Sequence, residues 1–200
     1  MKFGVLVCTL LLAVICNFAA PTVAAIEMAG FAGYTGSLHP TKPAEYVRST
    51  GGVGYGFLAR MDLGPGQIES GFLYTPTSMT YIVGASDVKA NGSYWILPLQ
   101  YRIPIYAPFL SLAIGPDFAL KGSTSYAIEG ASVNPSASGY KSHFGVQSSV
   151  QVSQDLGENL SAILDLRYRH GLNTAITVIN SQTTRLNLFM ISLGIQKRLD

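Results

Sequence analysis

The sequence predicts an all-β fold, an eight-stranded antiparallel up-and-down transmembrane β-barrel, and three observations carry this prediction. Apolar residues alternate with small or polar residues along eight segments, a period of two that is typical of strands. Short and long connections alternate between these segments, as in a barrel whose two ends face different compartments. Only 12% of the residues are charged, against about 25% in ordinary soluble domains.

The first 25 residues are predicted to form a cleaved signal peptide. A basic residue precedes an apolar stretch over residues 3–15, and small residues near Ala25 favour cleavage after that position. The stretch is shorter than the roughly 20 residues that a membrane-spanning helix requires. Both cysteines, Cys8 and Cys16, fall in the removed segment, so neither disulfides nor thiol catalysis are expected. The barrel domain then spans residues 26–200.

The first four strands are expected in the N-terminal half of this domain, at residues 28–37, 53–62, 67–75 and 95–102. The first is glycine-rich, and the second alternates apolar residues with glycine on its opposite face. The third follows a tight turn, Leu63-Gly64-Pro65-Gly66, whose glycine and proline residues are typical of turns. The fourth alternates apolar residues with Ile96, Pro98, Gln100 and Arg102. The prolines of the wider region from Trp95 to Leu120 argue against a helix.

The last four strands show the clearest alternation, at residues 110–118, 144–153, 160–169 and 189–198. In the sixth strand of the series, valine and phenylalanine alternate with glycine, glutamine and serine. In the seventh, leucine alternates with aspartate and arginine. The eighth sets large aliphatic residues against serine, glycine and glutamine. Each segment therefore has one apolar face and one small or polar face, as half-buried strands do.

The connections predict where the two ends of the barrel lie. Three are short, near residues 63–66, 103–107 and 155–159, and four are longer and polar, near residues 38–51, 77–93, 121–142 and 171–184. Short turns face the periplasm in bacterial outer-membrane barrels, and longer loops face outward. The sequence therefore predicts a location in the bacterial outer membrane.

The sorting of charges separates a membrane barrel from a soluble one. The strand-borne charges all fall opposite the large aliphatic residues: Arg60, Glu69, Arg102, Asp117, Asp165, Arg167 and Arg169. A soluble barrel shows its charges outside, whereas a membrane barrel turns its apolar face to lipid and its polar face inward. Four aromatic residues are expected at the membrane interfaces, Tyr74, Trp95, Tyr101 and Tyr168.

A charge network is expected inside the barrel. Counting outward from the 63–66 turn places Arg60 opposite Glu69, so the two should form a buried salt bridge. Arg102, Asp165 and Arg167 are expected to extend it, because a buried charge is costly when unpaired. Eight strands enclose just enough room for side chains to fill the interior, which favours a structural role. The alternative is an ion path or gate.

Several segments taken in order resemble a known family. They are residues 54–59, 66–74, 94–101, 107–116, 164–168 and 192–195. Together they are similar to the small outer membrane protein β-barrel domain family, related in shape to OmpA- and OmpX-like barrels. The resemblance implies a fold and a location but no single activity. It also implies outer-membrane lipid or lipopolysaccharide and the barrel assembly machinery as partners. The ending Lys197-Arg198-Leu199-Asp200 departs from the aromatic residue on which such barrels usually finish.

The sequence supports no enzyme or cofactor site. Some eight-stranded barrels are lipid deacylases, but a serine nucleophile two residues after His170 is lacking, since that position is Leu172. His39 and His143 are isolated in expected loops, and no histidine or carboxylate spacing indicates a metal. No cluster of basic residues indicates nucleic-acid binding.

The leading hypothesis is a monomeric, non-enzymatic outer-membrane barrel with a filled polar interior, a structural or interaction scaffold that acts through its long external loops. What those loops bind is left open. One alternative is a small passive channel or hydrophobic-solute transporter of the same fold. Another is a soluble, lipocalin-like barrel of the periplasm.

Overall fold

The computed structural model describes residues 25–38, 47–83, 86–128, 141–177 and 183–199. Residues 1–24 of the predicted signal peptide lie outside the described residues, as do parts of the predicted long loops. None of the described residues forms a helix long and apolar enough to cross a membrane.

Eight long strands make up the wall of the molecule. They are β1 (Ile26–Leu38), β3 (Gly52–Leu63), β4 (Gly66–Val83), β5 (Ser86–Tyr106), β6 (Leu110–Ile128), β7 (His143–Gly157), β8 (Leu160–Gly171) and β11 (Asn187–Leu199). Three short strands lie near one end: β2 (Val47–Thr50), β9 (Ile176–Thr177) and β10 (Thr183–Thr184). The eight predicted strand segments all fall within the long strands, so the predicted strand order is confirmed.

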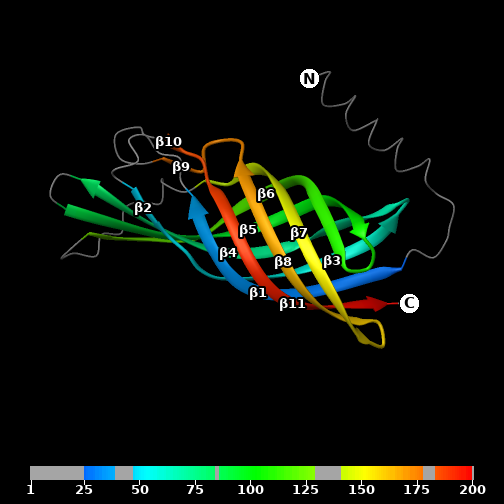
Figure 1. Ribbon diagram of the computed structural model, residues 1–200. Helices are drawn as coiled ribbons and strands as arrows, with labels where there is room; N and C mark the ends of the chain where they lie inside the picture. Colours follow the sequence, from blue (N-terminus) through cyan, green and yellow to red (C-terminus); the bar gives the residue numbers. More distant parts are fainter. Residues whose placement is uncertain (1–24, 39–46, 84–85, 129–140, 178–182, 200) are drawn as a thin grey trace, which may run out of the picture.

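The eight long strands close into a barrel (Figure 1). Successive long strands pair in antiparallel register, and β1 closes the cylinder by pairing with β11 from Ile26↔Leu199 to Leu38↔Asn187. Closure gives each of the eight strands a hydrogen-bonded neighbour on both sides within the cylinder, as a bilayer requires. The predicted fold class is confirmed.

The two-residue periodicity decides which side chains face inward. Along β8, exposed Leu164, Leu166 and Tyr168 alternate with buried Asp165 and Arg167. The same alternation recurs around the wall, so large apolar side chains are exposed while most strand-borne charges are buried. A water-soluble barrel has the opposite arrangement. This barrel is therefore of the transmembrane type.

The connections follow the predicted alternation at one end and depart from it at the other. Short turns join β3 to β4, β5 to β6 and β7 to β8, and the described ends of β1 and β11 lie with them. The predicted long loop at residues 77–93 is wrong, because β4 and β5 stay paired as far as Val83↔Ser86. Most of this hairpin extends past the closed barrel, where a strand needs no lipid-facing side. Its strands therefore lack the alternation by which a membrane strand is identified.

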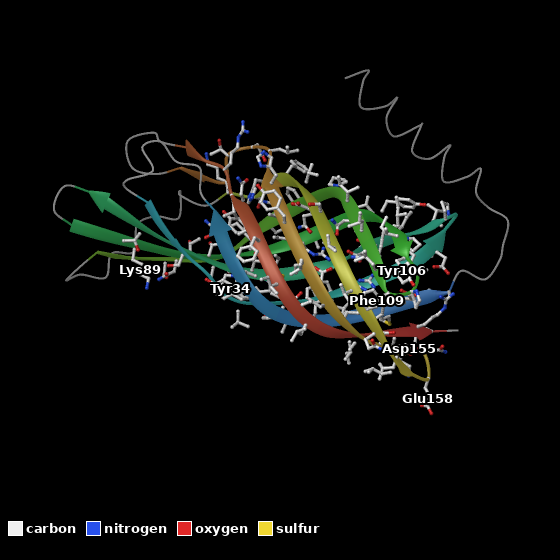
Figure 2. All side chains as sticks on the ribbon, in the orientation of Figure 1. Tyr34, Lys89, Tyr106, Phe109, Asp155 and Glu158 are labelled. Carbon is white, nitrogen blue, oxygen red and sulfur yellow. The ribbon has the colours of Figure 1, made fainter. Side chains whose placement is uncertain are left out.

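Strands β2, β4, β5 and β6 continue together past the barrel as a four-stranded extension. Thr50 pairs with Ser78 in β4, and Val88 in β5 pairs with Ile128 in β6. Figure 1 shows this extension at the end opposite the short turns, and Figure 2 places Lys89 on it, far from Asp155 and Glu158. Part of the predicted loop at 121–142 is thus strand as well. Residues 129–140 lie outside the described residues.

Candidate functional site

A buried carboxylate, Glu69, lies at the centre of the barrel interior. It projects from β4 and is 0% exposed. The register places Arg60 of β3 directly opposite it, as the hairpin count predicts. Arg102 comes from β5 on the other side of β4, and Arg167 reaches it from β8 across the lumen. Three strands therefore supply an arginine to one carboxylate.

The contacts around Glu69 are short and directional. Arg60 Nε donates to Glu69 Oε2 at 2.7 Å, and Arg102 Nε donates to the same oxygen at 2.9 Å. Arg167 Nη2 donates to Oε1 at 3.1 Å. Both carboxylate oxygens are thus occupied by guanidinium groups. The free-energy cost of burying each charge is offset only because its oppositely charged partners lie this close.

Asp165 is the second carboxylate of the cluster. It accepts from Arg167 Nε at 3.1 Å and lies 3.7 Å from Arg102 Nη2. The five residues expected to form the interior network therefore do lie together. Glutamine and serine side chains accept further hydrogen bonds from the guanidinium groups: Gln151 and Gln196 from Arg60, Ser111 and Ser149 from Arg102, and Gln100 and Gln147 from Arg167.

A second buried ion pair lies nearer the extended end. Arg169 Nε donates to Asp117 Oδ1 at 2.8 Å, and Arg169 Nη1 lies 2.8 Å from His143 Nε2. The expectation that His143 is isolated in a loop is wrong, because it begins β7 and is fully buried. The alternation in the sequence predicts that Asp117 and Arg169 both face inward. It does not predict that they pair, because the pair joins β6 to β8 across the intervening β7.

An apolar layer also fills the interior, and the expectation of a uniformly polar lumen missed it. The buried apolar side chains include Phe31, Leu58, Leu73, Ile96, Leu188 and Met190. Each projects from a strand that elsewhere carries polar inward residues. The Arg167 guanidinium lies 5.8 Å from the centroid of the Phe31 ring, so the two layers are in contact. Such inward apolar residues cannot be distinguished from lipid-facing residues by type alone.

A polar cavity of about 700 Å³ opens at the short-turn end. Arg60 and Arg102 line it, together with Glu27, Asp62 and Arg198 from the surrounding strands. The charge cluster therefore lies between this cavity and the rest of the lumen. The described residues contain no group of three or more histidine, cysteine, aspartate or glutamate side chains that could hold a metal.

The four predicted interfacial aromatics lie on the outer wall. Tyr74 and Trp95 face each other across β4 and β5 with centroids 5.1 Å apart, and Tyr55 stacks on Tyr74 at 5.0 Å. Tyr168 is 42% exposed on β8. Tyr101 lies toward the opposite end, where its hydroxyl donates to the Leu63 carbonyl at 3.1 Å.

Comparison with known proteins identifies the fold. No protein-family model and no curated protein matches the sequence. Among solved structures, Neisserial surface protein A (NspA) is 13% identical, covering 87% of this chain and 97% of that one, with a TM-score of 0.51. A major outer membrane protein from Thermus thermophilus is 12% identical, covering 88% of this chain and 100% of that one, with a TM-score of 0.55.

These similarities, with apolar side chains outside and charges inside, do not favour the soluble lipocalin-like alternative. The resemblance noted in the sequence is confirmed at the level of the fold. The chain has the fold of the small eight-stranded outer-membrane β-barrels.

Proposed function

We propose that this protein is an integral, monomeric component of the bacterial outer membrane, a non-enzymatic scaffold that acts through its extended end. The observation that carries the proposal is the buried ion-pair cluster around Glu69, which we infer closes the lumen. A barrel that conducts no solute offers its exterior surfaces for function. Export by a cleaved signal peptide over residues 1–25 and insertion by the barrel assembly machinery are part of the proposal.

Two layers of side chains would close the lumen, one of ion pairs and one of apolar residues. Glu69 is bound by arginines from three strands, so a passing solute would have to separate buried ion pairs. Breaking a buried pair costs about 3–5 kcal/mol. The apolar layer around Phe31 and Leu73 lies against the charged cluster and offers an ion no hydration. Both layers favour the scaffold over a passive channel.

The four-stranded extension is the surface that we expect to meet a partner. Strands β4 and β5 have 18 and 21 residues, whereas a tilted transmembrane strand needs about 9–11. The pairing of β4 with β5 continues past Tyr74↔Trp95 as far as Val83↔Ser86, and Figure 1 shows this part of the sheet projecting beyond the barrel. A rigid sheet loses less conformational entropy on binding than a mobile loop does.

Single-channel recording in planar bilayers tests the closed lumen. The wild-type barrel should give no defined openings. A double variant, Arg60→Ala with Glu69→Ala, removes two members of the cluster and should raise the conductance, which verifies that the assay detects an opened lumen. Well-defined wild-type openings would overturn the scaffold proposal and favour the small channel.

Cell fractionation tests the location. The protein should appear in the outer-membrane fraction and migrate differently on gels with and without heating, as folded barrels do. The mature chain should begin at Ile26 if the signal peptide is cleaved as proposed. Recovery in the periplasmic extract would contradict the membrane location.

A further inference from the structure

A groove of about 680 Å³ crosses the outer wall of the barrel. Its walls are apolar side chains of five adjacent strands, and most of them are exposed, for example Ile114 at 61% and Tyr168 at 42%. The groove is therefore cut into the face that a transmembrane barrel turns to lipid. Water does not fill an apolar groove in that position, so an apolar group must.

One small side chain forms the floor of the groove. Ser148 of β7 faces outward between Ile114 of β6 and Tyr168 of β8, its direct neighbours in the two registers. The row continues to Tyr101 on β5 and Phe189 on β11. Every other member of this row is a large apolar or aromatic residue. The serine therefore leaves a hollow between taller walls.

The groove has the length of one lipid chain. Its row crosses five strands at a spacing of about 4.8 Å, which is on the order of 19 Å. One leaflet of a bilayer core is roughly 15 Å thick. Because barrel strands are tilted by about 35–45°, a row perpendicular to them runs obliquely through the membrane. It descends from Phe189, near the extended end, toward Tyr101 at the short-turn end.

Two residues with exposed nitrogen-bearing side chains are close in sequence to the end of the groove at Phe189. His170 follows Tyr168 by two residues on the same outward face of β8 and is exposed. Arg185 is also exposed and precedes Phe189 by four residues. An arginine guanidinium matches the geometry of a phosphate group. No acidic side chain lines the groove among the described residues.

We propose that this groove binds one acyl chain of an anionic, phosphate-bearing lipid, with its phosphate at Arg185 and His170 and its chain over Ser148. The inference rests on the proposed membrane location. It assigns a specific lipid site to one sector of the wall, in addition to the general contact that any membrane barrel makes with its bilayer.

Native mass spectrometry tests the acyl part of the site. The full barrel is released from vesicles containing equal amounts of phosphatidylglycerol and phosphatidylcholine, and retained lipid is measured. Ser148→Leu fills the floor and removes contact with about two methylene groups, so retention should fall about tenfold. Ala59→Leu adds the same bulk on the outward face of β3, away from the groove, and should retain lipid as the wild type does.

The headgroup part has its own variant. Arg185→Gln should still retain lipid but lose the preference for phosphatidylglycerol. Lys89→Gln removes an exposed cation from the extension and should retain that preference. Equal retention by Ser148→Leu and Ala59→Leu would overturn the groove. Wild-type retention without headgroup preference would overturn the role of Arg185.

Folding and location are checked separately. Each variant is first shown to migrate as a folded barrel, and Ser148→Val replaces Ser148→Leu if the larger side chain prevents folding. Absence of the wild type from the outer-membrane fraction would contradict the proposed function. Loss of lipid retention in a correctly located Ser148→Leu barrel supports the groove and leaves the proposed function standing.

Discussion

Glu69 shows how one residue controls the interior of this barrel. Arg60, Arg102 and Arg167 are all buried, and their mutual repulsion is offset by the carboxylate that they share. Asp165 supplies the other negative charge within reach of Arg102 and Arg167. Such a cluster stabilises a folded chain only while every member is present.

Replacing Glu69 with glutamine should therefore destabilise the barrel. Glu69→Gln keeps the shape but leaves the three buried guanidinium groups with only Asp165 and, 4.0 Å from Arg60, Glu27, at a cost of about 3–5 kcal/mol, or roughly 10 °C in the unfolding midpoint. The midpoint is read from heat-modifiable gel migration. Glu158→Gln, in an exposed turn, is the control and should leave it unchanged. Equal unfolding midpoints for both variants would rule out that the ion pairs of Glu69 stabilise the barrel.

Gly145 is a second position where adding a single carbon atom should change the stability of the barrel. A Cβ there would lie 2.6 Å from Arg169 Nη2 and 2.9 Å from Asp117 Oδ2, both closer than van der Waals contact allows. Gly145→Ala should push this ion pair apart and destabilise the barrel by roughly 1–3 kcal/mol. Gly30→Ala has no atom within 4 Å of the added carbon and serves as the control. If both variants unfold at the same temperature, the ion pair tolerates the displacement.

At the scale of the elements, the strands have two parts with different sequence rules. Within the barrel, each strand has an exposed apolar face and an inward face, so its sequence alternates. Beyond the barrel, β4 and β5 are held by backbone pairing from Ser78↔Asn91 to Val83↔Ser86. This difference explains why eight transmembrane segments were evident in the sequence while the extended hairpin was not.

The extended hairpin should be dispensable for folding. Ser78 and Asn91 face each other in register, and their side chains hydrogen-bond at 2.7 Å. Replacing residues 79–90 with an Asn-Gly turn closes the hairpin at that pair, because such a turn suits two-residue β-hairpins. The shortened chain should fold with an unfolding midpoint close to that of the wild type. A chain that no longer forms a heat-modifiable barrel would show that the extension is needed for assembly.

At the scale of the whole molecule, we expect the aromatic residues to set the depth of the barrel in the membrane. Trp95 is the sole tryptophan of the sequence, and it packs among Tyr55, Phe72 and Tyr74 on the outer wall. Tryptophan and tyrosine concentrate at membrane–water interfaces. The barrel should therefore lie with this cluster at the headgroup level and with the extension in water.

Fluorescence of Trp95 checks this placement directly. In vesicles of brominated lipids, quenching should be strongest when the bromines lie near the headgroups and weaker when they lie near the chain ends. Trp95→Phe removes the signal and identifies its source. Strongest quenching at the chain ends would place the cluster in the middle of the bilayer and contradict the proposed depth.

The strand order, the inward and outward faces and the opposition of Arg60 and Glu69 could all be predicted from the chain. These features depend on a two-residue period and on local counting from a turn, which are visible in the chain. Three contacts became evident only in the folded barrel: Arg167 with Glu69, His143 with Arg169, and Ser148 at the base of the outer groove. These contacts depend on the stagger and closure of the barrel, which place residues far apart in the chain at one level.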